Sequence, residues 1–160
     1  MTASSDARPE LLALLERVRA DERAATLPAF THADAVELGT RALALAVERS
    51  LPVAIRVTRG DQLAFHAATA GTSADNDAWI ERKIRLVRRL EISSLQARVR
   101  HELDGDDLGW LDPARYALAG GCIPLRMAGG AFVGTLTVSG LPDVDDHDLA
   151  MEAVRAHLAG

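Results

Sequence analysis

The segment from His66 to Lys83, HAATAGTSADNDAWIERK, gathers side chains that could hold a small ligand. A histidine precedes a polar loop, and the loop leads into an expected helix with Trp79, Arg82 and Lys83 in its first two turns. The polar loop contributes Gly71, Thr72, Ser73, Asp75, Asn76 and Asp77. Backbone N–H groups at a helix start and nearby cations suit an anionic or carboxylate-bearing ligand. The segment therefore predicts a site for a small anionic molecule.

The expected helix after this loop carries a basic face that has two interpretations. The face is solvated or contacts a second subunit, or it binds an anion. Arg82 and Lys83 are the better ligand candidates because they lie nearest the loop. Trp79 is an anchor in the core or in an interface, or its ring stacks on a flat ligand. The basic face consists of Arg82, Lys83, Arg85, Arg88 and Arg89.

The composition of the chain limits the classes of function. Its 160 residues, 48% of them hydrophobic, suffice for one globular domain with a real core. A net charge of −5 argues against nucleic acid or an acidic membrane as the main partner. The single cysteine, Cys122, excludes an internal disulfide and a cysteine-based zinc finger. We see neither a signal peptide nor a membrane span, and we expect a cytoplasmic protein.

Hydrophobic periodicity predicts two β-hairpins among several helices. Alternating apolar residues favour hairpins over 53–68 and 123–138. Two hairpins separated by a helix predict an α+β fold with one antiparallel sheet and helices on one face. The expected helices span 9–24, 31–50, 76–101 with a possible bend at Ser93 and Ser94, 113–120, and 143–158.

The domain organisation follows from the same pattern. We expect a single domain over residues 1–160, in which 1–30 form a tail and a helix and 31–158 form the core. Thr31 and Asp34 resemble a capping box at the start of the second helix. A glycine in the middle of a helix, such as Gly39, lowers helix stability by about 1 kcal/mol relative to alanine. Close packing of this helix on the sheet would explain why glycine is present.

The first hairpin constrains its own turn. A loop of two or four residues would place its two apolar sets on opposite faces of the sheet. We therefore expect an odd loop or a bulge at Gly60, which pairs Val57 with Leu63. His66 then lies on the face opposite Phe65, alongside Arg56.

Four motifs in chain order resemble the UPF0303 family, which is distantly similar to haem-degrading and haem-binding domains of the HbpS and GlcG type. The resemblance covers roughly residues 30–158. It implies a profilin-like α-β-α arrangement with a central antiparallel sheet, assembly into dimers or larger rings, and haem or another tetrapyrrole as a candidate ligand. The motifs are PVAIRVTRGDQLAFHA, AGTSADNDAWIERK, LDPARYALAGGCIPLR and VGTLTVSGLPDVDDHDL.

Residues at the matching positions are the candidates for ligand binding. The third motif departs from the family pattern, because Cys122 and Ile123 follow the two glycines where the family prefers a small residue and then phenylalanine. Ala119 stands where the family often has histidine, so if that histidine is a ligand in relatives, this chain lacks it. The candidate ligand-binding residues are His66, Gly71, Thr72, Asn76, Trp79, Arg82, Lys83, Ser139 and His147.

The histidines and nucleophiles also have simpler interpretations. His66 is a haem axial ligand, a metal ligand or an acid/base group, or it is a packed side chain that bonds the loop backbone. His147 contributes to helix-start electrostatics, or it meets His66 through the fold or across a subunit interface. No spaced cluster predicts a metal site. Ser73 and Ser139 lack a nucleophile motif, and Cys122 is typical of a buried filler.

Three hypotheses about function remain open from the sequence. The first is an oligomeric protein that binds a small anionic or tetrapyrrole ligand near His66, Asn76, Arg82 and Lys83. The second is an oxidative enzyme acting on haem, and no catalytic residue for it stands out. The third is a structural or interaction protein whose polar motif shapes a subunit interface. We favour the first.

Overall fold

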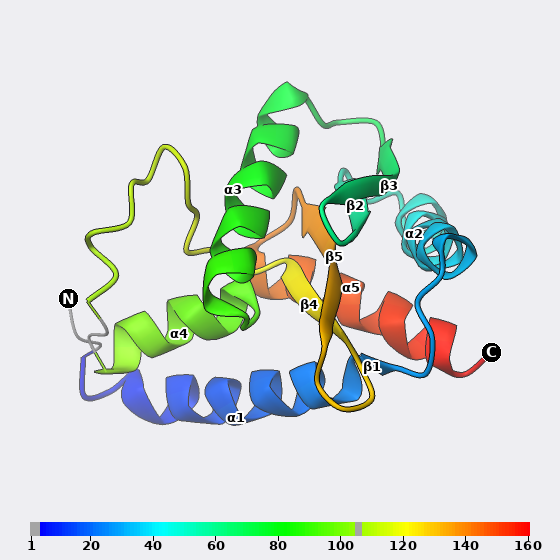
Figure 1. Ribbon diagram of the computed structural model, residues 1–160. Coiled ribbons are helices and arrows are strands. Elements are labelled where there is room, and N and C mark those ends of the chain that lie inside the picture. The colour runs from blue at the N-terminus through cyan, green and yellow to red at the C-terminus, as the bar shows by residue number, and fades with distance from the viewer. Residues whose placement is uncertain (1–3, 105–106) are drawn as a thin grey trace.

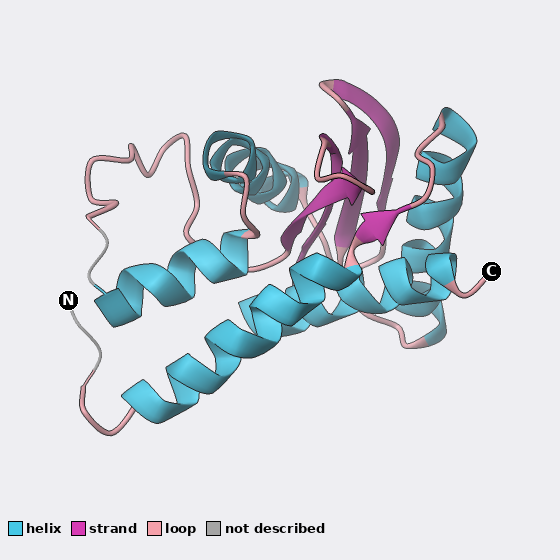
Figure 2. Ribbon diagram, turned by 60° about the horizontal axis from the view of Figure 1, so that its bottom comes forward, coloured by secondary structure: helices cyan, strands magenta, loops and turns pink. Residues whose placement is uncertain are grey.

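The fold is built on a five-stranded sheet with helices on both faces (Figures 1 and 2). A computed structural model describes residues 4–104 and 107–160. In chain order the elements are α1 (Arg8–Ala24), β1 (Thr26–Leu27), α2 (His32–Glu48), β2 (Ala54–Arg59), β3 (Gln62–Ala68), α3 (Ala74–Leu90), α4 (Ser94–Asp104), β4 (Cys122–Met127), β5 (Phe132–Ser139) and α5 (Asp143–Leu158). The strand order is β1-β4-β5-β2-β3, and only the short β1–β4 pair among these is parallel. The expected α+β class is confirmed.

Both faces of the sheet are covered. Helices α2 and α5 pack on one face, and α3 packs on the other (Figure 2). Strand β2 shows why, because Ile55 and Val57 belong to the main core with α2 and α5, whereas Ala54 packs with Ile80 and Ile84 of α3. The periodicity-based prediction of helices on one face is therefore wrong. The α-β-α arrangement that the family resemblance implied is confirmed.

The first hairpin contains a bulge, which determines the face of the sheet on which its apolar side chains lie. Arg59 pairs with Gln62 across a two-residue turn, and the register shifts between Val57 and Thr58. The predicted odd loop and the Val57–Leu63 pair are therefore wrong, since Val57 pairs with Phe65. The shift nevertheless brings Phe65 and Ala67 to the face of Val57 and Ile55, whereas Leu63 pairs with Thr58 on the other face. His66 pairs with Arg56 on the opposite face, as predicted.

Helix α2 begins and packs as its sequence indicates. The Thr31 hydroxyl accepts a bond from the Asp34 amide and the Asp34 carboxylate accepts one from the Thr31 amide, which confirms the capping box. Gly39 lies against the ring of Phe65 on β3, and a Cβ at this position would overlap the ring. The missing side chain thus lets α2 approach the sheet closely.

Two predicted helices are wrong in detail. The predicted helix over 76–101 is two helices, because Glu91 adopts a left-handed conformation with φ 55° and ends α3. The Ser93 hydroxyl then accepts the amide of Gln96 and helps to start α4. The predicted helix over 113–120 is a single turn after Asp112, because the chain leaves it when the Ala117 amide bonds the Arg82 carbonyl of α3.

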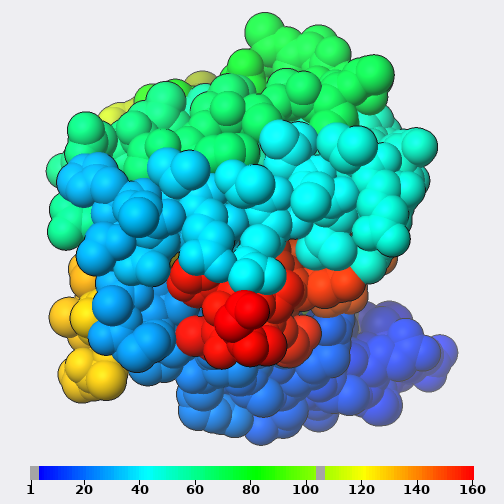
Figure 3. All heavy atoms as spheres, turned by 90° about the vertical axis from the view of Figure 1, so that its right-hand side faces the viewer, coloured from blue at the N-terminus to red at the C-terminus, as the bar shows by residue number. Residues whose placement is uncertain are grey.

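Helix α1 is part of the packed chain. Its apolar side chains pack against α4, with Leu15 and Val18 buried. At its other end the buried Asp21 accepts a hydrogen bond from Arg155 at 2.6 Å and lies 3.0 Å from Nε2 of His147, both on α5. Figure 3 shows α1 beneath α2 and the C-terminal end of α5. Within residues 4–104 and 107–160, no helix has the length and apolar character needed to cross a bilayer.

We predict that Gly39→Leu lowers the free energy of unfolding by about 2–3 kcal/mol, because the new side chain must displace Phe65 from α2. Urea denaturation measures this loss. Thr40→Leu is the matched control, since it adds a similar side chain at the next, exposed position and should change the free energy by less than about 0.5 kcal/mol. Equal effects of the two substitutions would show that α2 does not need the close approach.

We also predict a pH-dependent contribution from Asp21. Burial alone would raise the pKa of Asp21, but the His147 hydrogen bond and the charges of His147, Arg155 and Arg17 outweigh burial and lower the pKa below 3.8. A carboxylate with a lowered folded-state pKa stabilises the fold above pH 3.8, and this stabilisation is lost as the pH falls through the lowered pKa. Asp21→Asn should therefore cost about 1–3 kcal/mol at pH 7 and less at acidic pH.

Urea denaturation at neutral and acidic pH measures the contribution of Asp21. Glu16→Gln on the same helix is the control, because its carboxylate is exposed and its ion pair with Arg19 contributes little. An Asp21→Asn loss that stays constant as the pH falls would contradict the prediction.

Candidate functional site

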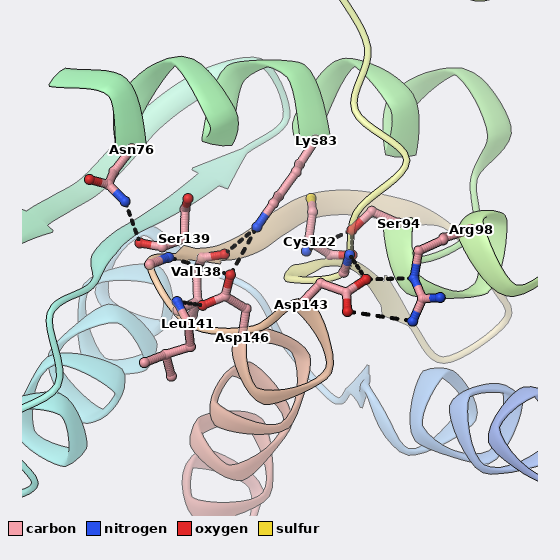
Figure 4. A network of polar contacts seen from close by, with 12 residues as sticks. Asn76, Lys83, Ser94, Arg98, Cys122, Val138, Ser139, Leu141, Asp143 and Asp146 are labelled. Atoms are coloured by element: carbon pink, nitrogen blue, oxygen red, sulfur yellow. Dashed lines mark hydrogen bonds and ion pairs between the residues drawn. The ribbon is translucent and has the colours of Figure 1, made fainter. Parts of the chain in front are cut away.

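Two segments that are far apart in the sequence meet at one cleft. The first is the start of α3, and the second is the end of β5 with the turn into α5 (Figure 4). The cleft has a volume of about 350 Å³. It is lined by Asp75, Asn76, Trp79 and Lys83 from α3, by Ser139, Gly140 and Leu141, and by Ala119, Asp143 and Asp146. Two of the motifs that indicated a site thus lie on the same cleft.

The start of α3 is fixed by its own cap. The Ser73 hydroxyl accepts the Asp75 amide at 3.3 Å, and Oδ1 of Asn76 accepts the Ser73 amide at 3.0 Å. Asn76 also reaches β5, because its Nδ2 donates to the Ser139 carbonyl at 3.4 Å. The cap therefore places the N-terminal end of α3 beside Ser139, the last residue of the central strand β5.

A buried ion pair forms the base of the cleft. Nζ of Lys83 lies 3.1 Å from Oδ2 of Asp146 and donates to the Val138 carbonyl at 3.0 Å. Both charged side chains are 3% exposed. This one ammonium group thereby joins α3, β5 and α5, as Figure 4 shows.

Asp146 also holds the turn that leads into α5. Its carboxylate accepts the backbone amides of Leu141 at 2.9 Å and Gly140 at 3.4 Å. Burial raises the pKa of Asp146, against the opposing effects of the Lys83 charge and of these hydrogen bonds. The carboxylate therefore depends on its partners to remain in a buried position.

A second carboxylate attaches the 119–121 segment to the cleft. Asp143 pairs with Nε of Arg98 at 2.6 Å and accepts the Gly120 amide at 3.1 Å. The next residue, Gly121, has φ +128°, and a Cβ there would lie 2.8 Å from Nζ of Lys83. Glycine at this position therefore leaves room for the buried ammonium group.

The two predicted cations at the helix start are not equivalent. Lys83 is neutralised by Asp146 inside the protein. Arg82 points away from this pair, because its guanidinium stacks over the Trp79 ring at 4.1 Å and donates to the Pro113 carbonyl at 3.4 Å. Arg82 and Lys83 therefore do not form the joint anion-binding pair that the sequence suggested.

His66 lies on the other side of α3 from the cleft. Its Nε2 is 3.2 Å from Oδ1 of Asp77, and its Nδ1 accepts from Nε of Arg56 at 3.4 Å. Arg56 in turn pairs with Glu81 at 3.0 Å. Asp77 and Glu81 are one turn apart, on the side of α3 that faces β2 and β3. Both ring nitrogens of His66 thus have partners within the chain.

The other predicted ligand-binding residues shape the chain near the cleft or lie away from it. The Thr72 hydroxyl donates to the Thr69 carbonyl at 2.7 Å, and Gly71, with φ +94°, turns the loop beside Pro52. His147 is fully buried and faces Asp21 of α1. Of the nine candidates, the cleft brings together only Asn76, Trp79, Lys83 and Ser139.

Several lining residues were absent from the candidate list. Asp75, Asp143 and Asp146 lie in the motifs, but no local sequence pattern marks their carboxylates as part of one site. Ala119 carried a signal only as the position where relatives often have histidine. No local pattern pairs Asp146 with Lys83, because the two residues lie 63 positions apart.

Metal and thiol chemistry have little support in the described chain. Asp21, His147 and Asp148 are its one group of potential ligands with atoms within 4.8 Å of one another. Arg155 and Arg17 already pair with the two carboxylates, each at 2.6 Å. Burial raises the pKa of Cys122 to about 12, so its thiol stays protonated at neutral pH.

Comparisons with known proteins establish the family. The sequence model of the family described as "Haem degrading protein HbpS-like" matches residues 30–155. A UPF0303 protein of Streptomyces avermitilis is 44% identical over 151 residues, which are 92% of this chain and 91% of that protein. A UPF0303 protein of Brucella canis is 40% identical over 142 residues, which are 86% and 83% of the two chains. The resemblance drawn from the motifs is therefore confirmed.

Solved structures share the fold. The Ybr137w protein superposes with a TM-score of 0.82 at 28% identity, over 98% of this chain and 96% of that one. A PduOC–heme complex superposes with a TM-score of 0.69 at 18% identity, over 80% and 94% of the two chains, and at this identity the likeness concerns the fold alone. With the family match and the relatives of at least 40% identity, the chain belongs to the HbpS-like family, and within it to the UPF0303 proteins.

Proposed function

We propose that this protein binds a small molecule in the cleft and works as a homo-oligomer. The observation that carries the proposal is the meeting of the α3 motif and the β5–α5 motif on one cleft. Its volume of about 350 Å³ is at the lower end of the range for small-molecule sites, which is about 300–1,000 Å³. The network beneath it is rigidly bonded, so the site is largely preformed.

The free groups of the cleft indicate the chemistry of the ligand. Trp79 is 36% exposed and offers an aromatic face. Among the described residues, the Asp75 carboxylate and the Ser139 hydroxyl line the cleft without a side-chain hydrogen bond. A flat molecule with hydrogen-bond donors complements such a surface. The negative charge of Asp75 disfavours an anionic group at this place. For the cleft itself, a flat ligand with hydrogen-bond donors therefore replaces the anionic ligand expected from the sequence.

Tetrapyrroles are the ligand class to which the family points. The matching family is described as haem degrading, and PduOC was crystallised with heme. A tetrapyrrole is flat, and its metal-free form carries N–H donors. At about 350 Å³ the cleft accepts one edge of such a ring rather than the whole ring.

Coordination of haem iron does not fit the cleft. Haem iron is held by histidine, cysteine, methionine or tyrosine, and the described lining of the cleft has none of these. His66 lies across α3, and both its nitrogens have partners. We therefore favour a ligand held by stacking and hydrogen bonds. A haem-degrading enzyme, the alternative considered from the sequence, would need an iron ligand facing the cleft.

The test is a titration of the purified protein with haemin and with iron-free protoporphyrin, followed by Soret absorbance and tryptophan fluorescence. We expect saturable binding of both, at one site per chain and with similar affinity. Ala119→Phe fills the cleft and should weaken both by at least about tenfold, or about 1.4 kcal/mol. Ala24→Phe adds the same ring at an exposed position at the end of α1 and should leave both unchanged.

A His66→Ala variant separates the two modes of binding. If it binds both porphyrins as the natural chain does, stacking in the cleft is supported. Binding of haemin alone that is lost in His66→Ala and retained in Ala119→Phe would assign a haem site at His66 and contradict the cleft. Absence of saturable binding to either porphyrin would remove the tetrapyrrole class.

A further inference from the structure

The tryptophans and the tyrosine of this protein lie on one surface. The chain has two tryptophans and one tyrosine, and all three stack with arginines on the outer side of α3 and on the loop that follows α4. Arg89 lies over Trp110 at 4.3 Å and over Tyr116 at 5.5 Å. We call this the arginine–aromatic surface, consisting of Trp79, Arg82, Arg89, Trp110, Arg115 and Tyr116.

The arginines of this surface differ from most others in the chain. Nine other arginines form ion pairs with carboxylates that the structure describes, such as Arg49 with Glu152 at 2.5 Å. Within the described residues, Arg82, Arg89 and Arg115 have no carboxylate in ion-pair distance and contact rings or neutral oxygens instead. Three positive charges on the arginine–aromatic surface are thus left for an outside partner.

Carboxylates without cation partners border the same surface. Asp75 lies one turn before Trp79 on α3, and Asp107 and Asp112 flank Trp110 in the loop. The Asp107 and Asp112 carboxylates accept only the amides of nearby residues, at 3.2 and 2.9 Å. As far as the structure describes the chain, none of the three has an ion pair. The surface therefore carries unpaired charges of both signs.

We propose that the arginine–aromatic surface is the contact between two copies of this chain. A two-fold contact uses the same patch on both subunits, so the patch must be complementary to itself. Unpaired arginines and aspartates on one patch meet this condition, because each arginine of one copy can pair with an aspartate of the other. Tryptophan, tyrosine and arginine are also the side chains that anchor protein interfaces most often.

The exposure of the tryptophans supports the same conclusion. Trp110 is 55% exposed and Trp79 is 36% exposed, in a chain with only 4% aromatic residues. Trp79 also lines the cleft, so a docked copy would cover the edge of the ligand site. This inference names the surface of the assembly in the proposed function, and it stands whether or not the ligand is a tetrapyrrole.

Single-stranded nucleic acid is the competing partner, because arginines and exposed aromatic rings also stack on bases. The net charge of −5 and the three bordering aspartates oppose a polyanion at this surface. The observations therefore favour a second copy of the chain.

The experiment is sedimentation velocity on charge-reversed variants. Arg89→Glu/Arg115→Glu makes the surface acidic, and Asp107→Arg/Asp112→Arg makes it basic. We expect the natural chain to sediment as a multiple of its 17.1 kDa mass and each variant alone to lose half of its mass or more. A mixture of the two variants should regain the mass of the natural chain, because opposite charges face each other again. Arg19→Glu/Arg23→Glu on α1 is the matched control and should keep the natural mass.

The mixing experiment separates a lost contact from a lost fold, since an unfolded variant cannot be restored by its counterpart. A monomeric natural chain at micromolar concentration, or variants that keep its mass, would overturn the proposal. Saturable binding of a fluorescent oligothymidine by the natural chain, lost in Trp110→Ser, would overturn it in favour of nucleic acid. If the sedimentation masses are as expected but the natural chain does not bind porphyrin, only the proposed ligand is contradicted.

Discussion

The buried ion pair between Lys83 and Asp146 is the constraint on which the rest of the site depends. Two charges out of water are stable only when each has partners in good geometry. The ammonium group has the Val138 carbonyl and the carboxylate, and the carboxylate has two backbone amides of the turn before α5. These requirements hold α3, β5 and α5 at fixed positions. The cleft lies directly above this arrangement.

One helix then separates three environments. The side of α3 with Asn76 and Lys83 faces the cleft, and the side with Asp77 and Glu81 meets His66 and Arg56 on the sheet. The outer side carries the arginine–aromatic surface. The helical period distributes residues of one motif over all three. A contiguous motif therefore does not correspond to a contiguous site, and a ligand in the cleft contacts only some of its residues.

Short-range patterns were predictable from the sequence. The Thr31 cap, the glycine at position 39 and the apolar face that Val57 shares with Phe65 each follow from residues within one element or one turn. The Lys83–Asp146 and Asp21–His147 contacts could not be predicted, since they join residues 63 and 126 positions apart. Strand β1 has two residues, too few for a periodic signal. The break after α3 depends on the backbone conformation of Glu91, which periodicity does not report.

The measurement that tests this account most directly is a double-mutant cycle on the buried pair, with Lys83→Met and Asp146→Asn in urea denaturation. We predict that each single substitution lowers the free energy of unfolding by about 3–5 kcal/mol. The double variant should lose less than the sum of the two, by about 1–3 kcal/mol. The exposed pair Arg85 and Glu81 on the same helix, tested as Arg85→Met and Glu81→Gln, provides the reference. A coupling energy no larger than in the exposed pair would contradict the role of Lys83 and Asp146.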